Sequence, residues 1–302
     1  MGRRRSVAIV TAVLVAVPAA AAMPVPDTAP RGLVKIFGFD YRAHDGAQRL
    51  AFLVLPRWYG PHDHPPIPLV ISPHGRGIDA VQNALLWGSL PARGRFALLC
   101  PEGQGRRLVL FSWGDPGQVG DLARMPRLAR RAFPWLRIAR RRIYAVGESM
   151  GGQETLLLLA RHPRLLAGAA AFDAPANMGL RYRDFRLLRR GLRLQRLARY
   201  EIGGSPGLDP RRYALRSPLA LARRIASSGV PLELWWSRDD RVVVDQAAQS
   251  GLLFRTIERF DPRAPVRQFV GRWGHGLEFR RDLPKALERL GIYRVRARYA
   301  IY

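Results

Sequence analysis

Three residues far apart in the chain have the types that nucleophilic attack on a carbonyl requires. Ser149 lies in a G-x-S-x-G pattern at 147–151, Asp240 lies about ninety residues later, and His275 lies between two glycines. A serine hydroxyl is a weak nucleophile near neutral pH and needs a base, usually histidine, which a carboxylate orients. We therefore expect Ser149 as the nucleophile, His275 as the base and Asp240 as the orienting acid.

Two other aspartates could be the orienting acid instead of Asp240. Asp239 would take the role if the loop were shifted by one residue, and Asp173 ends the preceding apolar segment. Each of these carboxylates could instead cap a turn or pair with a nearby arginine. For His275, the alternative interpretation is a loop histidine that is satisfied by local hydrogen bonds.

The segments around Ser149 favour a sharp strand-to-helix turn. An apolar run at 142–146 precedes the pattern, and a leucine-rich stretch at 153–160 with helical character follows it. Side chains at Gly147 and Gly151 would collide with the neighbouring strand and helix in such a turn. The turn would raise the Ser149 hydroxyl above the sheet, where the N–H groups of the new helix also point.

Acyl transfer also needs two backbone N–H donors for the oxyanion, and losing one costs on the order of 3 kcal/mol in the barrier. Met150, directly after the serine, is expected to supply one. The second is expected from the segment 73–77, Pro-His-Gly-Arg-Gly, with Arg76 as the first choice and Gly75 as the second. Trp113 and Asp173 are the further residues that we expect to contact substrate, although Trp113 could equally lie in a surface loop.

The elements that must position these residues follow a regular rhythm. Apolar segments that alternate with helical ones predict a mostly parallel sheet that is covered by helices on both faces. Ligands bind beyond the carboxyl ends of strands in such sheets, and every candidate residue falls there. The predicted strands are 33–39, 49–55, 68–71, 96–100, 143–146, 166–172, 232–236 and 266–270, with helices at 81–90 and 121–133.

One domain at 33–302 accounts for this pattern, and no internal repeat is present. The segment 179–210 breaks the rhythm because it is dense in arginine and leucine. A helical cap over the site and a surface insertion are both compatible with it.

Cys100 is the single cysteine, so no intrachain disulfide is expected, and its apolar surroundings indicate a buried strand.

The first residues have the composition of a secretory signal peptide. A basic start, an apolar run at 7–17 and small residues at 20–22 predict cleavage after residue 22, with 23–32 extended. We therefore expect a secreted or cell-envelope protein, exported by the Sec or the twin-arginine route, with no stable membrane insertion after cleavage. An uncleaved anchor is the alternative.

The formal charge of +27 comes almost entirely from arginine, since Lys35 and Lys285 are the only lysines. No zinc knuckle, helix-turn-helix or RNA-binding motif accompanies it, so we expect no nucleic-acid partner. Contact with anionic cell-envelope polymers is a secondary interpretation. His62 and His64 lie in a proline-bracketed loop that is a poor metal cage, and no metal site is predicted.

Together these residues resemble the α/β-hydrolase superfamily over about 68–290. Gly-Glu-Ser-Met-Gly-Gly with the leucine-rich segment after it is similar to the superfamily's nucleophile turn and helix, and 73–77 resembles its H-G-G-G turn with Arg76 in place of a glycine. Within the superfamily, the chain is similar to secreted esterases of the polyhydroxybutyrate-depolymerase and feruloyl-esterase type, and to prolyl-oligopeptidase catalytic domains. The resemblance implies a Ser149–His275–Asp240 triad, an acyl-enzyme intermediate and no metal or organic cofactor.

The leading hypothesis is a secreted serine hydrolase that cleaves carboxylic esters of small or polymeric substrates. A serine peptidase of the prolyl-oligopeptidase type is the first alternative, because the same triad cleaves amides. A non-catalytic module with this fold, which binds anionic envelope polymers, is the second.

Overall fold

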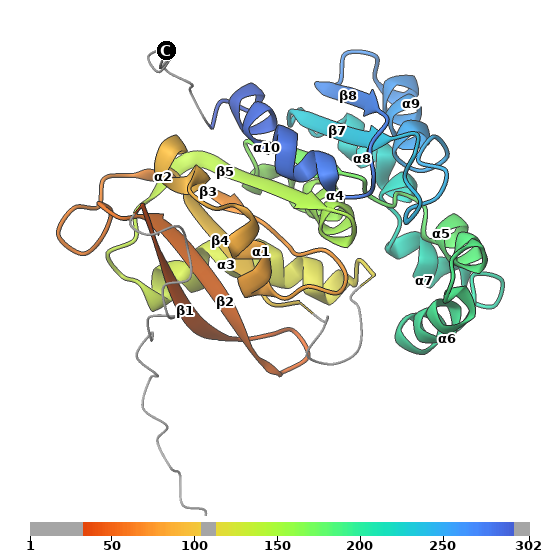
Figure 1. Cartoon of the computed structure of the whole chain (residues 1–302), viewed down its shortest axis with the longest axis horizontal. Coiled ribbons are helices and arrows are strands. Elements are labelled where there is room, and N and C mark those ends of the chain that lie inside the picture. Colours follow the sequence, from red (N-terminus) through yellow and green to blue (C-terminus); the bar gives the residue numbers. More distant parts are fainter. Residues whose placement is uncertain (1–32, 104–112, 293–302) are drawn as a thin grey trace, which may run out of the picture.

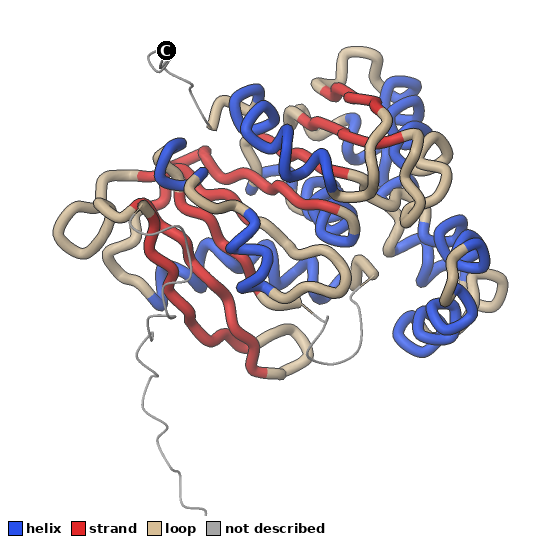
Figure 2. The backbone as a smooth tube through the Cα atoms, viewed as in Figure 1, coloured by secondary structure: helices blue, strands red, loops and turns tan. Residues whose placement is uncertain are grey.

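The computed structural model describes residues 33–103 and 113–292, which form one eight-stranded sheet with helices on both faces (Figures 1 and 2). The predicted signal peptide 1–22 and extended segment 23–32 lie outside the described residues. The strands are β1 (Val34–Arg42), β2 (Gln48–Pro56), β3 (Ile67–Ile71), β4 (Ala97–Pro101), β5 (Ile138–Glu148), β6 (Gly168–Phe172), β7 (Leu232–Ser237) and β8 (Val266–Gly271).

The strand order is β1-β2-β4-β3-β5-β6-β7-β8. β2 runs antiparallel to β1 and β4, whereas β4, β3, β5, β6, β7 and β8 are parallel to one another. Because parallel strands end on the same side, the loops that leave β3, β5, β6, β7 and β8 meet along one edge. The predicted mostly parallel α/β sheet is confirmed.

Two apolar layers hold the helices against the sheet. Buried side chains of α3, α4, α8 and α9 form one layer, and those of α1 and α10 form the other. The helices are α1 (Ala80–Leu86), α2 (Leu90–Gly94), α3 (Pro116–Ala132), α4 (Met150–Arg161), α5 (Met178–Asp184), α6 (Gly191–Ile202), α7 (Pro210–Leu215), α8 (Ala222–Ala226), α9 (Ser250–Phe260) and α10 (Leu277–Arg289), with short 3₁₀ turns η2 (Pro163–Leu165), η3 (Phe185–Leu187) and η4 (Pro218–Leu221).

The central strands are buried on both faces, which explains their continuous apolar sequences. Every residue of β3, β4, β6 and β7 is buried, and Cys100 lies in β4 as expected. In β6, Ala169 and Ala171 contact one helical layer while Ala170 and Phe172 contact the other. Burial on both sides removes the polar alternation that a half-exposed strand would show.

The predicted element bounds differ from the structure mainly at helix ends. The helix predicted at 81–90 stops at Leu86, and Gly88 then takes a left-handed φ of 49° before α2 begins. The helix predicted at 121–133 begins earlier, at Pro116, because the Asp115 carboxylate accepts the N–H groups of the first turn and proline suits that position. Caps of this kind are local features that periodicity alone does not reveal.

The arginine-rich segment 179–210, for which the sequence left a cap or a surface insertion open, forms helices that lie to one side of the sheet. Figure 1 shows α5, α6 and α7 grouped together, and we call α5, η3, α6 and α7 the cap. A small apolar cluster joins the cap to Trp113, which precedes α3; its buried members are Trp113, Met178, Phe185, Ala198, Ile202 and Tyr213. Within the described residues, no helix combines the length and apolar character needed to cross a membrane.

Candidate active site

Three of the predicted residues meet at the edge where the parallel strands end. Ser149 follows β5 directly, Asp240 lies three residues beyond β7, and His275 lies four residues beyond β8. His275 Nε2 lies 2.9 Å from Ser149 Oγ, and His275 Nδ1 lies 2.8 Å from Asp240 Oδ2. A carboxylate only accepts, so Nδ1 carries the ring proton and Nε2 offers its lone pair to the serine hydroxyl.

The turn at Ser149 has the strained backbone that the glycines predict. Ser149 has φ 56° and ψ −122°, and its N–H donates to Phe172 O at the end of β6. A Cβ atom on Gly147 would lie 2.5 Å from the Gly151 carbonyl carbon, and one on Gly151 would overlap the Pro73 carbonyl oxygen. The two glycines therefore allow β5, α4 and the loop after β3 to approach closely enough to expose the serine.

The carboxylate of Asp240 is held by several donors besides His275. Its Oδ1 accepts from the N–H groups of Val242 and Val243 at 2.8 and 2.9 Å, and its Oδ2 also accepts from Gln246 Nε2. Burial by itself would raise the pKa of Asp240, but the hydrogen bonds from His275 and this loop lower that pKa below its usual value. The carboxylate is thus kept ionised and fixed in place.

The other two candidate acids have different surroundings. The Asp239 side chain is half-exposed and lies 3.5 Å from Arg272, whereas the His275 ring contacts Asp240. Asp173 is fully buried, and its carboxylate accepts from the Gly276 N–H, the Ser237 N–H and Trp273 Nε1 at 3.0 to 3.2 Å. Asp173 therefore ties the loop that carries the histidine to the ends of β6 and β7, and burial raises its pKa to about 6.

Among the described residues, Asp173, Asp240 and His275 also lie close enough together to be considered as metal ligands. Their hydrogen bonds account for this proximity, because Asp240 already binds His275 Nδ1. The oxygens of Asp173 face three N–H groups, whose positive ends would oppose a cation. These contacts are therefore typical of a histidine that carboxylates hold in place, rather than of a metal centre.

Glu148 was not predicted as a site residue, although it directly precedes Ser149 in the sequence. Its Oε1 lies 3.3 Å from His275 Nε2, the ring nitrogen that also contacts the serine. A Cβ atom on Gly75 or on Gly276 would lie 2.8 Å from the Glu148 carboxylate, so both glycines make room for it. The signal that the sequence offered was an acidic residue directly before the predicted nucleophile Ser149.

The charges around His275 determine its pKa. Burial by itself lowers the pKa of His275, but the hydrogen bond that its Nδ1–H donates to Asp240 and the charges of Glu148, Asp240 and Asp173 together raise that pKa above its usual value. Burial raises the pKa of Glu148 more than His275 lowers it. The surroundings thus favour the imidazolium that forms when a histidine takes a proton from serine.

The two backbone segments expected to bind the oxyanion lie next to each other. Met150 begins α4, and the loop after β3 packs on the same turn through Pro73. His74 Nε2 accepts from the Gly103 N–H at 3.1 Å, so His74 Nδ1 carries the proton and donates to Gly75 O at 2.9 Å. Because C=O and N–H point in opposite directions in a trans peptide, this bond orients the Arg76 N–H, the predicted donor, away from His74.

Trp113 contacts both α4 and the cap. Gln153 Nε2, in the first turn of α4, donates to Trp113 O and to Arg216 O at 3.2 and 2.7 Å. The Trp113 ring contacts the Phe185 ring at a centroid distance of 5.1 Å. The predicted substrate-contacting tryptophan therefore joins the cap to the first turn of α4, and it is buried rather than part of a surface loop.

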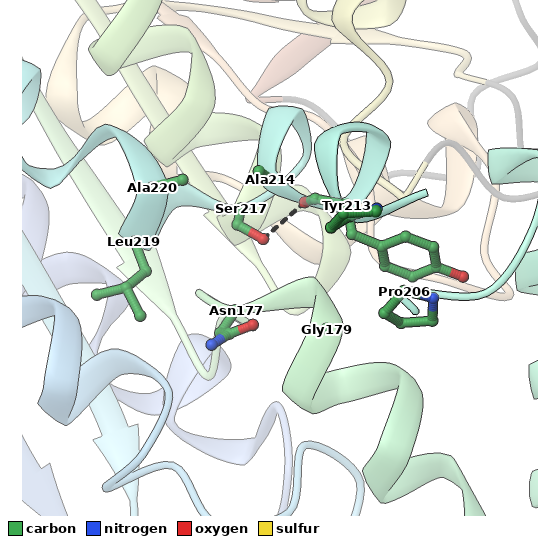
Figure 3. A pocket seen from close by; sticks show the side chains of 9 residues that line it. Asn177, Gly179, Pro206, Tyr213, Ala214, Ser217, Leu219 and Ala220 are labelled. Carbon is green, nitrogen blue, oxygen red and sulfur yellow. Dashed lines mark hydrogen bonds between the residues drawn. The ribbon is translucent and has the colours of Figure 1, made fainter. Parts of the chain in front are cut away.

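A cavity of about 300 Å³ lies under the cap (Figure 3). None of its lining residues belongs to the Ser149–His275–Asp240 cluster. Ser217 Oγ, which donates to Tyr213 O, also accepts from the Met178 N–H, so the polar groups at this wall have partners. The lining residues are Asn177, Gly179, Pro206, Pro210, Tyr213, Ala214, Ser217, Leu219 and Ala220.

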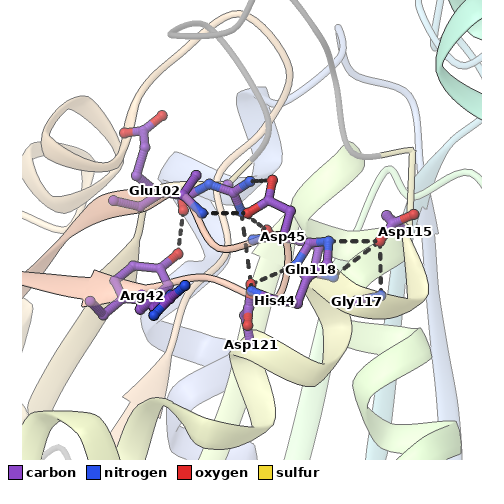
Figure 4. A network of polar contacts seen from close by, with 12 residues as sticks. Arg42, His44, Asp45, Glu102, Asp115, Gly117, Gln118 and Asp121 are labelled. Atoms are coloured by element: carbon purple, nitrogen blue, oxygen red, sulfur yellow. Dashed lines mark hydrogen bonds and ion pairs between the residues drawn. The ribbon is translucent and has the colours of Figure 1, made fainter. Parts of the chain in front are cut away.

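A second polar cluster lies at the start of α3 (Figure 4). His44, for which the sequence offered no partner, contacts Asp121 Oδ2 through Nδ1 at 2.8 Å and Asp115 Oδ1 through Nε2 at 3.4 Å. Arg49 and Arg124 also pair with the buried Asp121. These contacts join the β1–β2 hairpin to α3, which is a structural role.

Comparisons with known proteins agree on the fold. No protein-family model matches the chain, and no curated protein matches its sequence. Among solved structures, it is similar to an acylaminoacyl peptidase from Pyrococcus horikoshii, with TM-score 0.64 and 16% identity over 88% of this chain and 43% of that one. The chain thus spans less than half the length of that peptidase.

Two hydrolase structures match over most of their own length. An acetyl xylan esterase from Paenibacillus sp. R4 has TM-score 0.62 and 16% identity, over 90% of this chain and 88% of that one. An S-formylglutathione hydrolase from Staphylococcus aureus has TM-score 0.62 and 14% identity, over 86% of this chain and 99% of that one. The strand order, the turn at Ser149 and these similarities lead to one conclusion about the architecture: the chain has the α/β-hydrolase fold that these three structures share.

Proposed function

We propose that this protein is a serine hydrolase that cleaves carboxylic esters, with Ser149, His275 and Asp240 as its catalytic triad. The observation that carries the proposal is the unbroken hydrogen-bonded line from Ser149 Oγ through His275 to Asp240, on a turn strained to expose the serine. Such a line supplies the base, and the orientation of the base, that a serine nucleophile needs.

In the first half of the reaction, His275 Nε2 takes the proton of Ser149 while Oγ attacks the ester carbonyl carbon. The resulting oxyanion accepts hydrogen bonds from the N–H groups of Met150 and Arg76. As the tetrahedral intermediate collapses, the bond to the alcohol oxygen breaks, and His275 donates its proton to that oxygen. The free alcohol leaves, and an acyl-enzyme remains.

In the second half, water replaces the alcohol. His275 takes a proton from water, and the hydroxide oxygen attacks the acyl carbon. Collapse breaks the bond to Ser149 Oγ, which receives its proton back from His275, and a carboxylic acid is released. Asp240 remains ionised throughout and stabilises the imidazolium in both halves.

Ester cleavage is favoured by the coverage of the similar structures. The acetyl xylan esterase and the S-formylglutathione hydrolase match over 88% and 99% of their own chains, whereas the acylaminoacyl peptidase matches over 43%. A peptidase is the second candidate function, because that peptidase has a TM-score of 0.64 and the same triad cleaves amides. Comparing p-nitrophenyl esters with proline-containing p-nitroanilides distinguishes the two.

The proposal is tested by covalent labelling with a fluorophosphonate probe. We expect the wild type to be labelled and to hydrolyse p-nitrophenyl acetate, and Ser149→Ala to lose labelling and at least about 10⁴-fold in kcat. The control is Ser227→Ala, which changes an exposed serine outside the site and should leave both readouts unchanged. A folded wild type that resists the probe would instead favour the non-catalytic polymer-binding module.

We further propose that the protein is exported to the cell envelope or the medium, on the basis of the basic and apolar residues at its amino end. Mass spectrometry of the protein recovered outside the cytoplasm should find a first residue at Met23. A chain that retains 1–22 would indicate the uncleaved anchor.

A further inference from the structure

The outward face of α6 combines large apolar side chains with arginines. Leu192 is 66% exposed and Tyr200 is 77% exposed, although water disfavours both side chains. Together with Arg196 they are spaced by four residues, so the three lie in one row along the helix. Arg193 and Arg199 flank this row and are exposed as well. In the view of Figure 1, α6 lies at the outer edge of the molecule.

A different side of α6 packs inside the cap. Ala198 and Ile202 are buried in the apolar cluster that joins the cap to Trp113, and Leu194 and Leu197 are half-buried against it. A surface helix of a globular protein typically has one apolar face, which the core covers. Here α6 has that covered face and, on its other side, further apolar side chains that remain exposed in the described structure.

The surroundings of the exposed row are strongly positive. The segment 185–200 contains six arginines and no acidic residue. All six arginines are exposed, and within the described ranges 33–103 and 113–292 none of them forms a salt bridge. Leu187, in η3 just before α6, is 70% exposed among them. The face therefore offers uncompensated cations and uncovered apolar side chains within one short stretch of chain.

This composition fits the surface of a bilayer that contains anionic lipids. Lipid phosphate groups attract the guanidinium groups, and the boundary of the acyl chains removes leucine and tyrosine side chains from water. A soluble polyanion would satisfy the arginines but would leave Leu187 and Leu192 in water. The exposed leucines therefore favour a membrane over a nucleic acid or an envelope polymer.

We propose that the cap binds the surface of anionic lipid membranes, with Leu187 and the outward face of α6 lying in the interface. Binding of this kind is peripheral and needs no helix that crosses the bilayer. It is independent of the proposed ester hydrolysis, because none of the residues on this face belongs to the Ser149–His275–Asp240 cluster.

Sedimentation with lipid vesicles tests the role of the charges. The protein is mixed, at about 0.15 M salt, with vesicles of phosphatidylcholine alone or of phosphatidylcholine and phosphatidylglycerol. We expect binding to the anionic vesicles only. The triple variant Arg193→Gln, Arg196→Gln and Arg199→Gln should bind them at least about thirtyfold more weakly, since each arginine near such a surface contributes about fivefold.

The matched control removes the same charge from another helix. Arg127, Arg130 and Arg131 are exposed arginines of α3, and changing all three to glutamine should leave binding nearly unchanged. An equal loss in the two triple variants would show that the net charge of the chain, rather than the face of α6, causes adsorption, and the proposal would fail. Circular dichroism checks that every variant keeps its helices.

A fluorescent label tests whether the apolar residues enter the bilayer. Because Cys100 is buried, Leu187→Cys supplies an exposed thiol for a dye whose emission depends on polarity. The emission should shift to shorter wavelength on anionic vesicles, whereas the control Phe260→Cys, at the exposed end of α9, should show no shift. The dye senses its own surroundings, so residues 1–22, which are the same in both variants, do not produce the difference.

Two results with the label would overturn the proposal. An equal shift at positions 187 and 260 would mean that the contact is not specific to the cap. An unshifted label at 187 would mean that the leucines stay in water. If that unshifted protein also binds heparin, and the triple variant of α6 does not, the face belongs to a soluble polyanion instead.

Discussion

His275 is surrounded by more negative charge than a triad alone supplies. Asp240 holds Nδ1, Glu148 lies 3.3 Å from Nε2, and Asp173 binds the backbone of the next residue. All three raise the pKa of the imidazole against the opposite effect of burial. Since the base must be neutral to accept the serine proton, activity should rise with pH through this raised pKa.

Glu148→Gln tests this effect. Removing a negative charge from beside Nε2 destabilises the imidazolium, so the pKa of His275 should fall and the acid limb of the kcat/KM profile should move to lower pH. The plateau value of kcat/KM above this pKa should also fall, because the imidazolium that forms during attack loses a stabilising charge. A pH profile with p-nitrophenyl acetate measures both.

The control for this prediction is Glu258→Gln, which neutralises an exposed glutamate in α9 outside the site. Its profile should coincide with that of the wild type. A Glu148→Gln profile with an unmoved acid limb would mean that Glu148 does not act on the base.

At the scale of elements, the turn between β5 and α4 depends on close packing against the loop after β3. Gly151→Ala should therefore lower the free energy of unfolding by about 2–3 kcal/mol, since its Cβ would overlap the Pro73 carbonyl oxygen and the backbone would have to move. Activity should fall as well, because both oxyanion segments are displaced. Urea denaturation and ester hydrolysis measure the two effects.

Gly120→Ala is the matched control for that substitution. Gly120 lies within α3, and a Cβ atom there would meet nothing within 4 Å. Alanine should raise the free energy of unfolding by about 0.5–1 kcal/mol, because it restricts the unfolded chain and favours the helix. A loss of stability at Gly120 equal to that at Gly151 would refute the steric explanation.

At the scale of the whole molecule, the formal charge of +27 creates a field that reaches beyond any single contact. Salt shortens this reach, since the screening length falls from about 30 Å at 0.01 M to about 8 Å at 0.15 M. We compare an ester that carries a free carboxylate, mono-p-nitrophenyl glutarate, with a neutral ester, p-nitrophenyl valerate. We expect kcat/KM for the anionic ester to fall steeply over that range of salt concentration, while kcat/KM for the neutral ester changes little. Equal salt dependence for the two esters would contradict this expectation.

The sequence by itself determined the alternation of strands and helices, the glycine-dependent turn at Ser149 and the serine, acid and histidine in their order along the chain. These features are local, because burial on two faces and a tight turn each leave a pattern within a few residues. The order of residues along the chain does not reveal which loops lie next to each other in the folded protein. Only the tertiary structure decided that Asp240 rather than Asp239 contacts His275, that Asp173 holds the histidine loop, and that Arg181 of α5 contacts the loop that carries Asp240. Each of these depends on strand register and on loop packing between segments distant in the chain, and a shift of one residue would exchange the two aspartates.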